Sequence, residues 1–133
     1  MFRSILLTVT LSIAFPVAAQ DVDGAETYDL LCASCHGASA MGEGPLADLL
    51  MVPVPDLRGL SARNDGTFPT EMIVRQIDGR DQMRAHGSPM PAFGGYFDDG
   101  APSMALKTED GMPILTSPAI VALIEYLRSI QEE

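Results

Sequence analysis

Two cysteines and an adjacent histidine carry the strongest chemical signal in the sequence. Cys32, Cys35 and His36 form the pattern C-x-x-C-H, and the chain contains no other cysteine. This spacing is typical of a covalent attachment site for c-type haem. Each thiol can add to one vinyl group of a porphyrin, and the next residue's imidazole is then held under the iron as an axial ligand. Because the cysteines stand at positions i and i+3, one helical face would present both of them.

Three other chemistries use closely spaced cysteines. A thioredoxin-like redox pair belongs in a βαβ pattern, which this sequence lacks. A zinc site needs a second pair of ligands, but the other histidine, His86, has no cysteine near it. A disulfide between Cys32 and Cys35 would close a very small and strained loop. The haem interpretation is therefore favoured over all three.

The first residues are typical of an export signal. Arg3 precedes a largely apolar run over residues 5–17, and residues 17–19 (Val-Ala-Ala) fit a small-residue cleavage site. The run is short for a bilayer span, although an uncleaved membrane anchor stays an alternative. The 133 residues leave room for one domain. We therefore expect a signal peptide over residues 1–19 and a single domain over residues 20–133.

The chain is strongly acidic. It carries 18 Asp and Glu against 8 Lys and Arg, a formal net charge of −10. This balance argues against nucleic acid as a partner, because the phosphate backbone would be repelled. A solvated acidic surface that aids solubility explains the excess of acids. An acidic docking face for a basic redox partner is the alternative.

The first helix of the domain is predicted to begin near Asp21 or Asp23, because either side chain can cap it. Gly24, Tyr28 and Cys32 then follow at steps of four, which places them on one face. Glycine inside a helix costs about 1 kcal/mol relative to alanine. Gly24 therefore indicates that another backbone passes close to this helix.

Two further helices are predicted later in the chain. Ser117-Pro118 supplies an N-cap followed by proline at the first helical position, ahead of apolar residues at helical spacing over 120–127. Residues 69–77 form the other predicted helix, which Asp78-Gly79 ends. No stretch alternates for long enough to predict a strand, and the role of the segment 97–117 is left open.

Together these features resemble the class I c-type cytochromes. In that family a glycine is followed four residues later by an aromatic residue and after four more by C-x-x-C-H, as are Gly24, Tyr28 and Cys32 here. The resemblance covers residues 22–131. It implies an all-α cytochrome c fold, with three to five short helices around one covalent haem c and with crossing N- and C-terminal helices. It also agrees with export, because this family acquires its haem outside the bacterial inner membrane.

The resemblance implies a carbonyl that accepts the free N–H of His36 from a proline-containing loop. Pro45 is the nearest match, and Pro53 or Pro55 could serve instead. Such a hydrogen bond would orient the imidazole and raise its basicity.

Met90 is the candidate for the second axial ligand. A thioether is a soft neutral ligand that raises the reduction potential of a haem, and Pro89 and Pro91 stiffen the loop around this one. The family presents its distal methionine in a similar M-P-x-F stretch. Met104 is the rival methionine, and His86 would instead give a bis-histidine haem of lower potential.

With iron bound by His36 and Met90 no position is open for a substrate. We therefore expect a single-electron carrier rather than an enzyme, working in the periplasm between respiratory or periplasmic redox proteins. It is expected to be a monomer that has no membrane span once the signal is removed. A haem subunit of a larger dehydrogenase or sulfur-oxidising complex is the alternative, and a gas-binding module would need an open sixth position.

Overall fold

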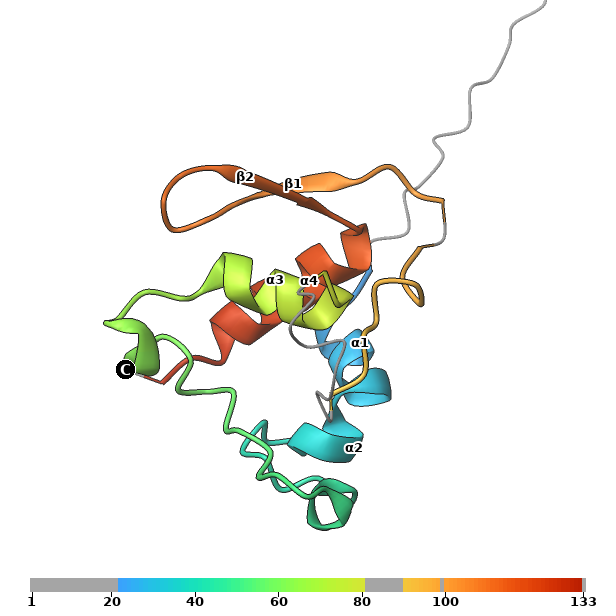
Figure 1. Cartoon of the computed structure of the whole chain (residues 1–133), viewed down its shortest axis with the longest axis vertical. Helices are drawn as coiled ribbons and strands as arrows, with labels where there is room; N and C mark the ends of the chain where they lie inside the picture. Colours follow the sequence, from blue (N-terminus) through green and yellow to red (C-terminus); the bar gives the residue numbers. More distant parts are fainter. Residues whose placement is uncertain (1–21, 81–89, 99, 133) are drawn as a thin grey trace, which may run out of the picture.

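The computed structural model describes residues 22–80, 90–98 and 100–132. This part of the chain is mostly helical and carries one small hairpin (Figure 1). Its α-helices are α1 (Gly24–Leu31), α2 (Ala33–His36), α3 (Thr70–Asp78) and α4 (Pro118–Ser129). Two short 3₁₀ turns, η1 (Ala47–Leu49) and η2 (Ala62–Asn64), lie in the long connection between α2 and α3. The strands are β1 (Met104–Lys107) and β2 (Pro113–Thr116).

The start of α1 is capped as the sequence predicts. Asp23 is the N-cap, and its Oδ1 accepts hydrogen bonds from the backbone N–H groups of Ala25 and Glu26 at 2.8 and 3.2 Å. These bonds satisfy donors that the first turn of a helix leaves free. Of the two predicted caps, Asp23 is therefore the one used, and Asp21 lies outside the described residues.

The first and last helices pack directly against each other, as predicted (Figure 1). A Cβ built on Gly24 would lie 2.1 Å from the carbonyl oxygen of Ala122, so only glycine allows the two backbones to approach this closely. The rings of Tyr28 and Tyr126 meet across the same interface, with centroids 5.0 Å apart. The crossing places the face of α1 that carries Cys32 beside the centre of the domain.

Helix α4 supplies much of the apolar core. Ser117 caps it by accepting a hydrogen bond from the N–H of Ile120 at 3.4 Å, and Pro118 stands at its first position. Its buried face consists of Ile120, Val121, Leu123, Ile124 and Leu127. Burying apolar side chains in this way is the main favourable contribution to folding.

Helix α3 begins and ends within one residue of its predicted bounds. Gly79 ends it in the left-handed conformation, with φ of 80°, as the Asp-Gly pair predicts. Glu71 and Arg75 form an ion pair of 2.8 Å on its exposed side. Ile73 and Ile77 point to the interior, as their spacing predicts.

The expectation that the chain has no strand is wrong for residues 104–116. β1 and β2 form an antiparallel hairpin in which Leu106 pairs with Ile114, and both of these side chains are buried. Each strand has only four residues, which is too short for a clear alternation. Packing of Leu106 and Ile114 onto the core explains the hairpin better than local propensity does.

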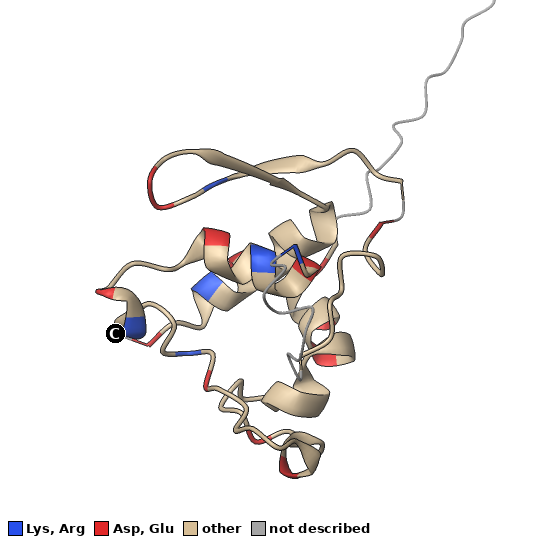
Figure 2. Cartoon of the chain, in the orientation of Figure 1, with Lys and Arg blue, Asp and Glu red and all other residues tan. Residues whose placement is uncertain are grey.

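Acidic side chains are distributed over several elements. Figure 2 shows them on α1, on the loops around η1, on α3 and at the tip of the hairpin. This distribution agrees with the solvated-surface interpretation of the charge. No helix within the described ranges is long and apolar enough to cross a membrane.

Candidate cofactor site

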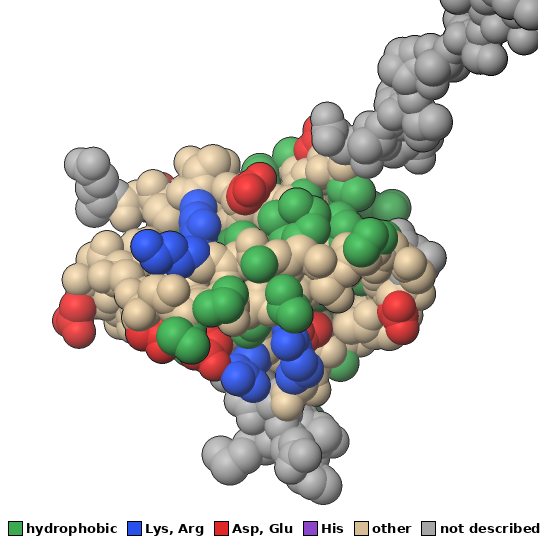
Figure 3. Space-filling model, turned by 90° about the horizontal axis from the view of Figure 1, so that it is seen from above, with side chains coloured by type: hydrophobic (Ala, Val, Ile, Leu, Met, Phe, Trp, Pro, Cys, Tyr) green, Lys and Arg blue, Asp and Glu red, His purple; other side chains and the backbone are tan. Residues whose placement is uncertain are grey.

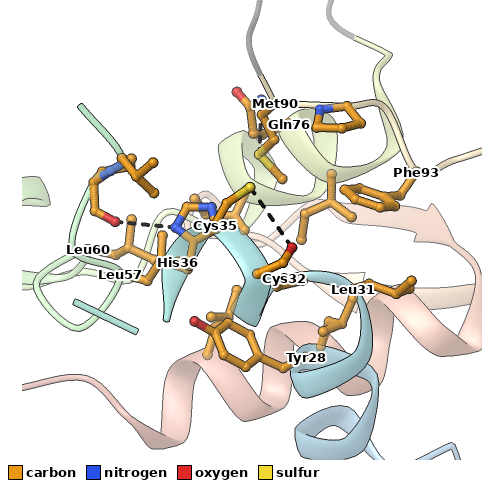
Figure 4. A pocket seen from close by; sticks show the side chains of 18 of the residues that line it. Tyr28, Leu31, Cys32, Cys35, His36, Leu57, Leu60, Gln76, Met90 and Phe93 are labelled. Atoms are coloured by element: carbon orange, nitrogen blue, oxygen red, sulfur yellow. Dashed lines mark hydrogen bonds between the residues drawn. The ribbon is translucent and has the colours of Figure 1, made fainter. Parts of the chain in front are cut away.

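A cavity of about 550 Å³ lies between α2, α3, α4 and the loops that follow α2 and precede residue 94 (Figure 4). This volume is within the range of roughly 300–1,000 Å³ that small-molecule and cofactor sites occupy. The lining is predominantly apolar, with residues such as Leu31, Leu46, Leu57, Leu60, Ile73, Phe93 and Leu127. An apolar organic group of cofactor size therefore fits the space better than a polar substrate does.

The predicted attachment residues all line this cavity. Cys32 ends α1 with φ of −110° and at the same time begins α2, which carries Cys35 and His36. The break at Cys32 turns the short helix α2, so that both thiols and the imidazole reach the same space. His36 is buried, whereas both cysteines are partly exposed.

The His36 ring is oriented by a backbone carbonyl. Its Nδ1 lies 3.3 Å from the oxygen of Pro55, which accepts a hydrogen bond when Nδ1 carries the proton. In that tautomer Nε2 holds the lone pair that a metal requires. Burial lowers the pKa of His36, while the bond to Pro55 acts in the opposite direction. The ring therefore favours the neutral form, which is the form that binds metals.

Of the three prolines that the sequence offered for this carbonyl, Pro55 provides it, and not Pro45, which was the nearest match to the family. The backbone on either side of Pro45 instead forms hydrogen bonds with α2. Gly44 N–H donates to the oxygen of Cys35 at 3.1 Å, and Leu46 N–H donates to the oxygen of Ser34 at 2.9 Å. These bonds cap the end of α2 and hold residues 44–46 beside its last carbonyls.

The two thiols are free in this structure. Burial, together with the neighbouring Cys35, raises the pKa of Cys32 to about 11. Cysteines that exchange disulfides have the opposite character, with a pKa lowered by a helix N-terminus or a nearby cation. This environment argues against the thioredoxin-like alternative. Within the described residues no group of three His, Cys, Asp or Glu side chains could hold a metal, and His86 lies outside them.

The structure brings Met90 to the same cavity and leaves Met104 outside it. Met90 lines the cavity, and its Sδ accepts a hydrogen bond from Nε2 of Gln76 at 3.5 Å (Figure 4). Met104 is in β1 and is 47% exposed. Met72 of α3 also lines the cavity, and His86 lies outside the described residues.

Two polar side chains of the lining were not predicted from the sequence. Arg63 is the one charged residue among the described residues that line the cavity, and Gln76 is the one amide. The Oε1 of Gln76 is buried and has no hydrogen-bond partner within the described part of the chain. A spacing signal was present for Gln76, since it follows Met72 by four and Ile73 by three residues and so shares their helical face.

We compared the sequence with models of known protein families. The model described as cytochrome c matches residues 22–131, which is most of the chain. The chain belongs to the cytochrome c family. Comparison with curated proteins and with solved structures gave no significant match.

Members of the cytochrome c family are electron carriers that hold haem c covalently. The cavity of this cytochrome c fits that cofactor on independent grounds. Its lining is predominantly apolar, as a porphyrin requires, and it contains two thiols, an oriented imidazole and the thioethers of Met72 and Met90. Thiols are the groups that form thioethers with haem, and imidazole and methionine sulfur are both established haem ligands. The predicted cofactor is thus supported by both the family and the chemistry of the lining.

Proposed function

We propose that this cytochrome c carries single electrons by means of one haem c bound through Cys32 and Cys35, with His36 and Met90 as axial ligands. The observation that supports this most is the shared cavity, which brings the C-x-x-C-H residues together with Met90, 54 positions after His36. Bound haem c would supply the one-electron couple between Fe(III) and Fe(II).

Each of these residues has a definite task in the proposal. Pro55 holds the His36 ring through Nδ1, which keeps Nε2 available. Met90 offers a neutral, soft sulfur, which favours the ferrous state and so raises the reduction potential. The apolar lining limits water, and a low local dielectric also disfavours the more charged ferric state. These effects together suit a carrier that accepts electrons readily.

The proposed setting of the carrier is the bacterial periplasm. The family match begins at residue 22, just after the predicted signal peptide over residues 1–19, and is compatible with an exported domain over residues 20–133. We propose that the mature protein is a monomer that shuttles between larger respiratory or periplasmic redox proteins. Its electron donor and acceptor would be proteins, and nucleic acid would not be a partner. The mature protein would have no membrane span.

Covalent haem attachment is the first expected result. Protein from a host that exports it and matures c-type cytochromes should retain its haem after denaturation and acid extraction. Its intact mass should equal that of the mature chain plus one haem. Cys35→Ala should leave at most one thioether, whereas Ser34→Ala should leave attachment unchanged, since this neighbour has no thiol. A wild-type mass equal to that of the bare chain, with haem supplied, would contradict the proposal.

Arg63 is expected to face the charged edge of the bound haem. Haem carries two propionates, and this side chain is the one cation among the described lining residues. Arg63→Gln should lower the reduction potential by roughly a few tens of millivolts, because a nearby positive charge disfavours the ferric state. Arg75→Gln serves as the control, since Arg75 is paired with Glu71 on the exposed side of α3. Equal potentials for Arg63→Gln and wild type would place this charge away from the haem.

A further inference from the structure

One backbone carbonyl of the hairpin, that of Leu115, accepts a hydrogen bond from outside the hairpin. Thr108 N–H donates to the oxygen of Met112 at 2.9 Å, which makes these two a hydrogen-bonded pair of the ladder. Pairs alternate along an antiparallel ladder, so Ala105 and Leu115, three steps along the register, form a non-hydrogen-bonded pair. The carbonyl of Leu115 therefore points away from β1, at the outer edge of β2. At such an edge another part of the chain can act as the partner.

Arg80 provides that partner. Its Nη2 donates to the oxygen of Leu115 at 2.8 Å, and its Nε binds Oδ2 of Asp78. The backbone N–H of Arg80 also donates to Oδ1 of Asp78 at 2.9 Å. The carboxylate side chain of Asp78 is only 8% exposed, so this ion pair is better shielded from water than an ordinary surface pair.

The same end of α3 holds the loop that carries Met90. Phe93 N–H donates to the oxygen of Ile77 at 2.7 Å. A Cβ on Gly94 would lie 2.3 Å from the oxygen of Asp78, so the two backbones are in close contact there. Gln76, which directly precedes Ile77, donates to the sulfur of Met90 itself. The loop thus follows α3 from Gln76 to Asp78.

The hairpin itself lies on the opposite side of the helices from the cavity. In Figure 1 it lies above α3 and α4, whereas α2 lies below them. Its outer side chains face solvent, since Met112 is 63% and Leu115 is 59% exposed, and Figure 3 shows apolar side chains across this face. Arg80 is therefore a direct polar connection between the solvent-facing hairpin and the end of α3.

We propose that Arg80 is a positioning residue for Met90. By joining the β2 edge to Asp78, it holds the end of α3 in the position that fixes the loop over residues 90–94. A loop fixed in advance loses less freedom when its sulfur binds iron, so Arg80 strengthens that bond without contacting the haem. This gives the hairpin over residues 104–116 a function, and it rests on the proposed ligation of iron by Met90.

Competition with imidazole tests the proposal. Imidazole added to the ferric holoprotein must displace the Met90 sulfur, so its apparent dissociation constant reports how firmly that sulfur is held. Arg80→Met should lower this constant about fivefold, the effect expected from losing one partly exposed, charge-assisted interaction. Amide hydrogen exchange at Phe93 should become faster in the same variant.

Arg75→Met is the matched control. Arg75 lies on α3, five residues before Arg80, pairs with a carboxylate and is 47% exposed, against 42% for Arg80, but it pairs with Glu71 of the same helix. Arg75→Met should leave the apparent dissociation constant for imidazole within about twofold of the wild-type value, a change that corresponds to well under 1 kcal/mol. Arg80→Lys, which keeps the charge but lacks the planar fork, should give an intermediate constant and serves if the Met variant does not accumulate.

Two results would overturn the role of Arg80. One is an apparent dissociation constant for imidazole that is the same in both Arg80 variants as in wild type. The other is an equal shift in Arg75→Met, because the effect would then follow from loss of any positive charge on or beside α3. Failure of the proposed function looks different: Met90→Ala would bind imidazole no more tightly than wild type, and the role of Arg80 would fall with the assignment of the ligand.

Discussion

Replacement of Gly24 by valine is expected to destabilise the folded protein by about 3 kcal/mol. A Cβ at this position would lie 2.1 Å from the oxygen and 2.6 Å from the carbonyl carbon of Ala122. These atoms belong to the backbone of α4 and cannot rotate away as a flexible side chain would. The two helices must therefore separate, which loosens the contact of Tyr28 with Tyr126. Urea unfolding of the holoprotein, followed by circular dichroism, measures the change.

Gly95→Val provides a control for the Gly24 result. No atom lies within 4 Å of a Cβ at Gly95, and its φ does not fall in the left-handed region. This substitution should change the free energy of unfolding by at most about 0.5 kcal/mol. Gly24→Ala should lie between the two valine variants, because it adds one carbon at the crossing. A Gly24→Val protein as stable as wild type would show that the α1 and α4 backbones are farther apart than the structure places them.

The helices could be predicted because their signals are local. Asp23 and Ser117 are caps that act on N–H groups two or three residues later, and Gly79 ends α3 through its own backbone angle. The crossing of α1 with α4 was also predictable, since Gly24 would be an unfavourable helix residue without a close neighbour. The hairpin was not, because Leu106 and Ile114 form strands only where the core is already present to cover them.

In the candidate site, too, some residues could be predicted from local sequence and others could not. Cys32, Cys35 and His36 could be recognised from spacing, because the pattern C-x-x-C-H is contained within five consecutive residues. The carbonyl of Pro55 could not be assigned, since His36 is 19 residues away and three prolines were available. Arg63 reaches the cavity only through the path of the chain after α2, which no local pattern specifies, whereas Gln76 shares the helical face of Ile73 and could have been identified from its spacing. Contacts between distant segments therefore account for what the sequence did not reveal.

Met90→Ala is expected to produce the largest functional change. If the Met90 sulfur is the distal ligand, its removal leaves an open or water-filled position on the iron and removes a soft, neutral donor. The reduction potential should fall by roughly 0.1 V or more, a modest part of the ~0.8 V over which axial ligands can set it. The sulfur-to-iron charge-transfer band of the oxidised protein should disappear. The reduced protein should bind carbon monoxide readily, as a haem with an open position does.

Two further variants separate ligation from packing. Met90→His should restore six ligands and prevent carbon monoxide binding while keeping the potential low, because imidazole favours ferric iron more than a thioether does. Met104→Ala is the matched methionine control: its side chain is 47% exposed in β1 and is not among the residues that line the cavity. It should leave the charge-transfer band unchanged. If Met104→Ala abolishes the band and Met90→Ala preserves it, β1 supplies the ligand and Met90 only fills the cavity. If the band is present and neither variant affects it, Met72, which also lines the cavity, becomes the next candidate for the sulfur ligand. If the wild-type protein has no such band, His86 becomes the next candidate, and the potential should then already be low, because a second imidazole favours the ferric state.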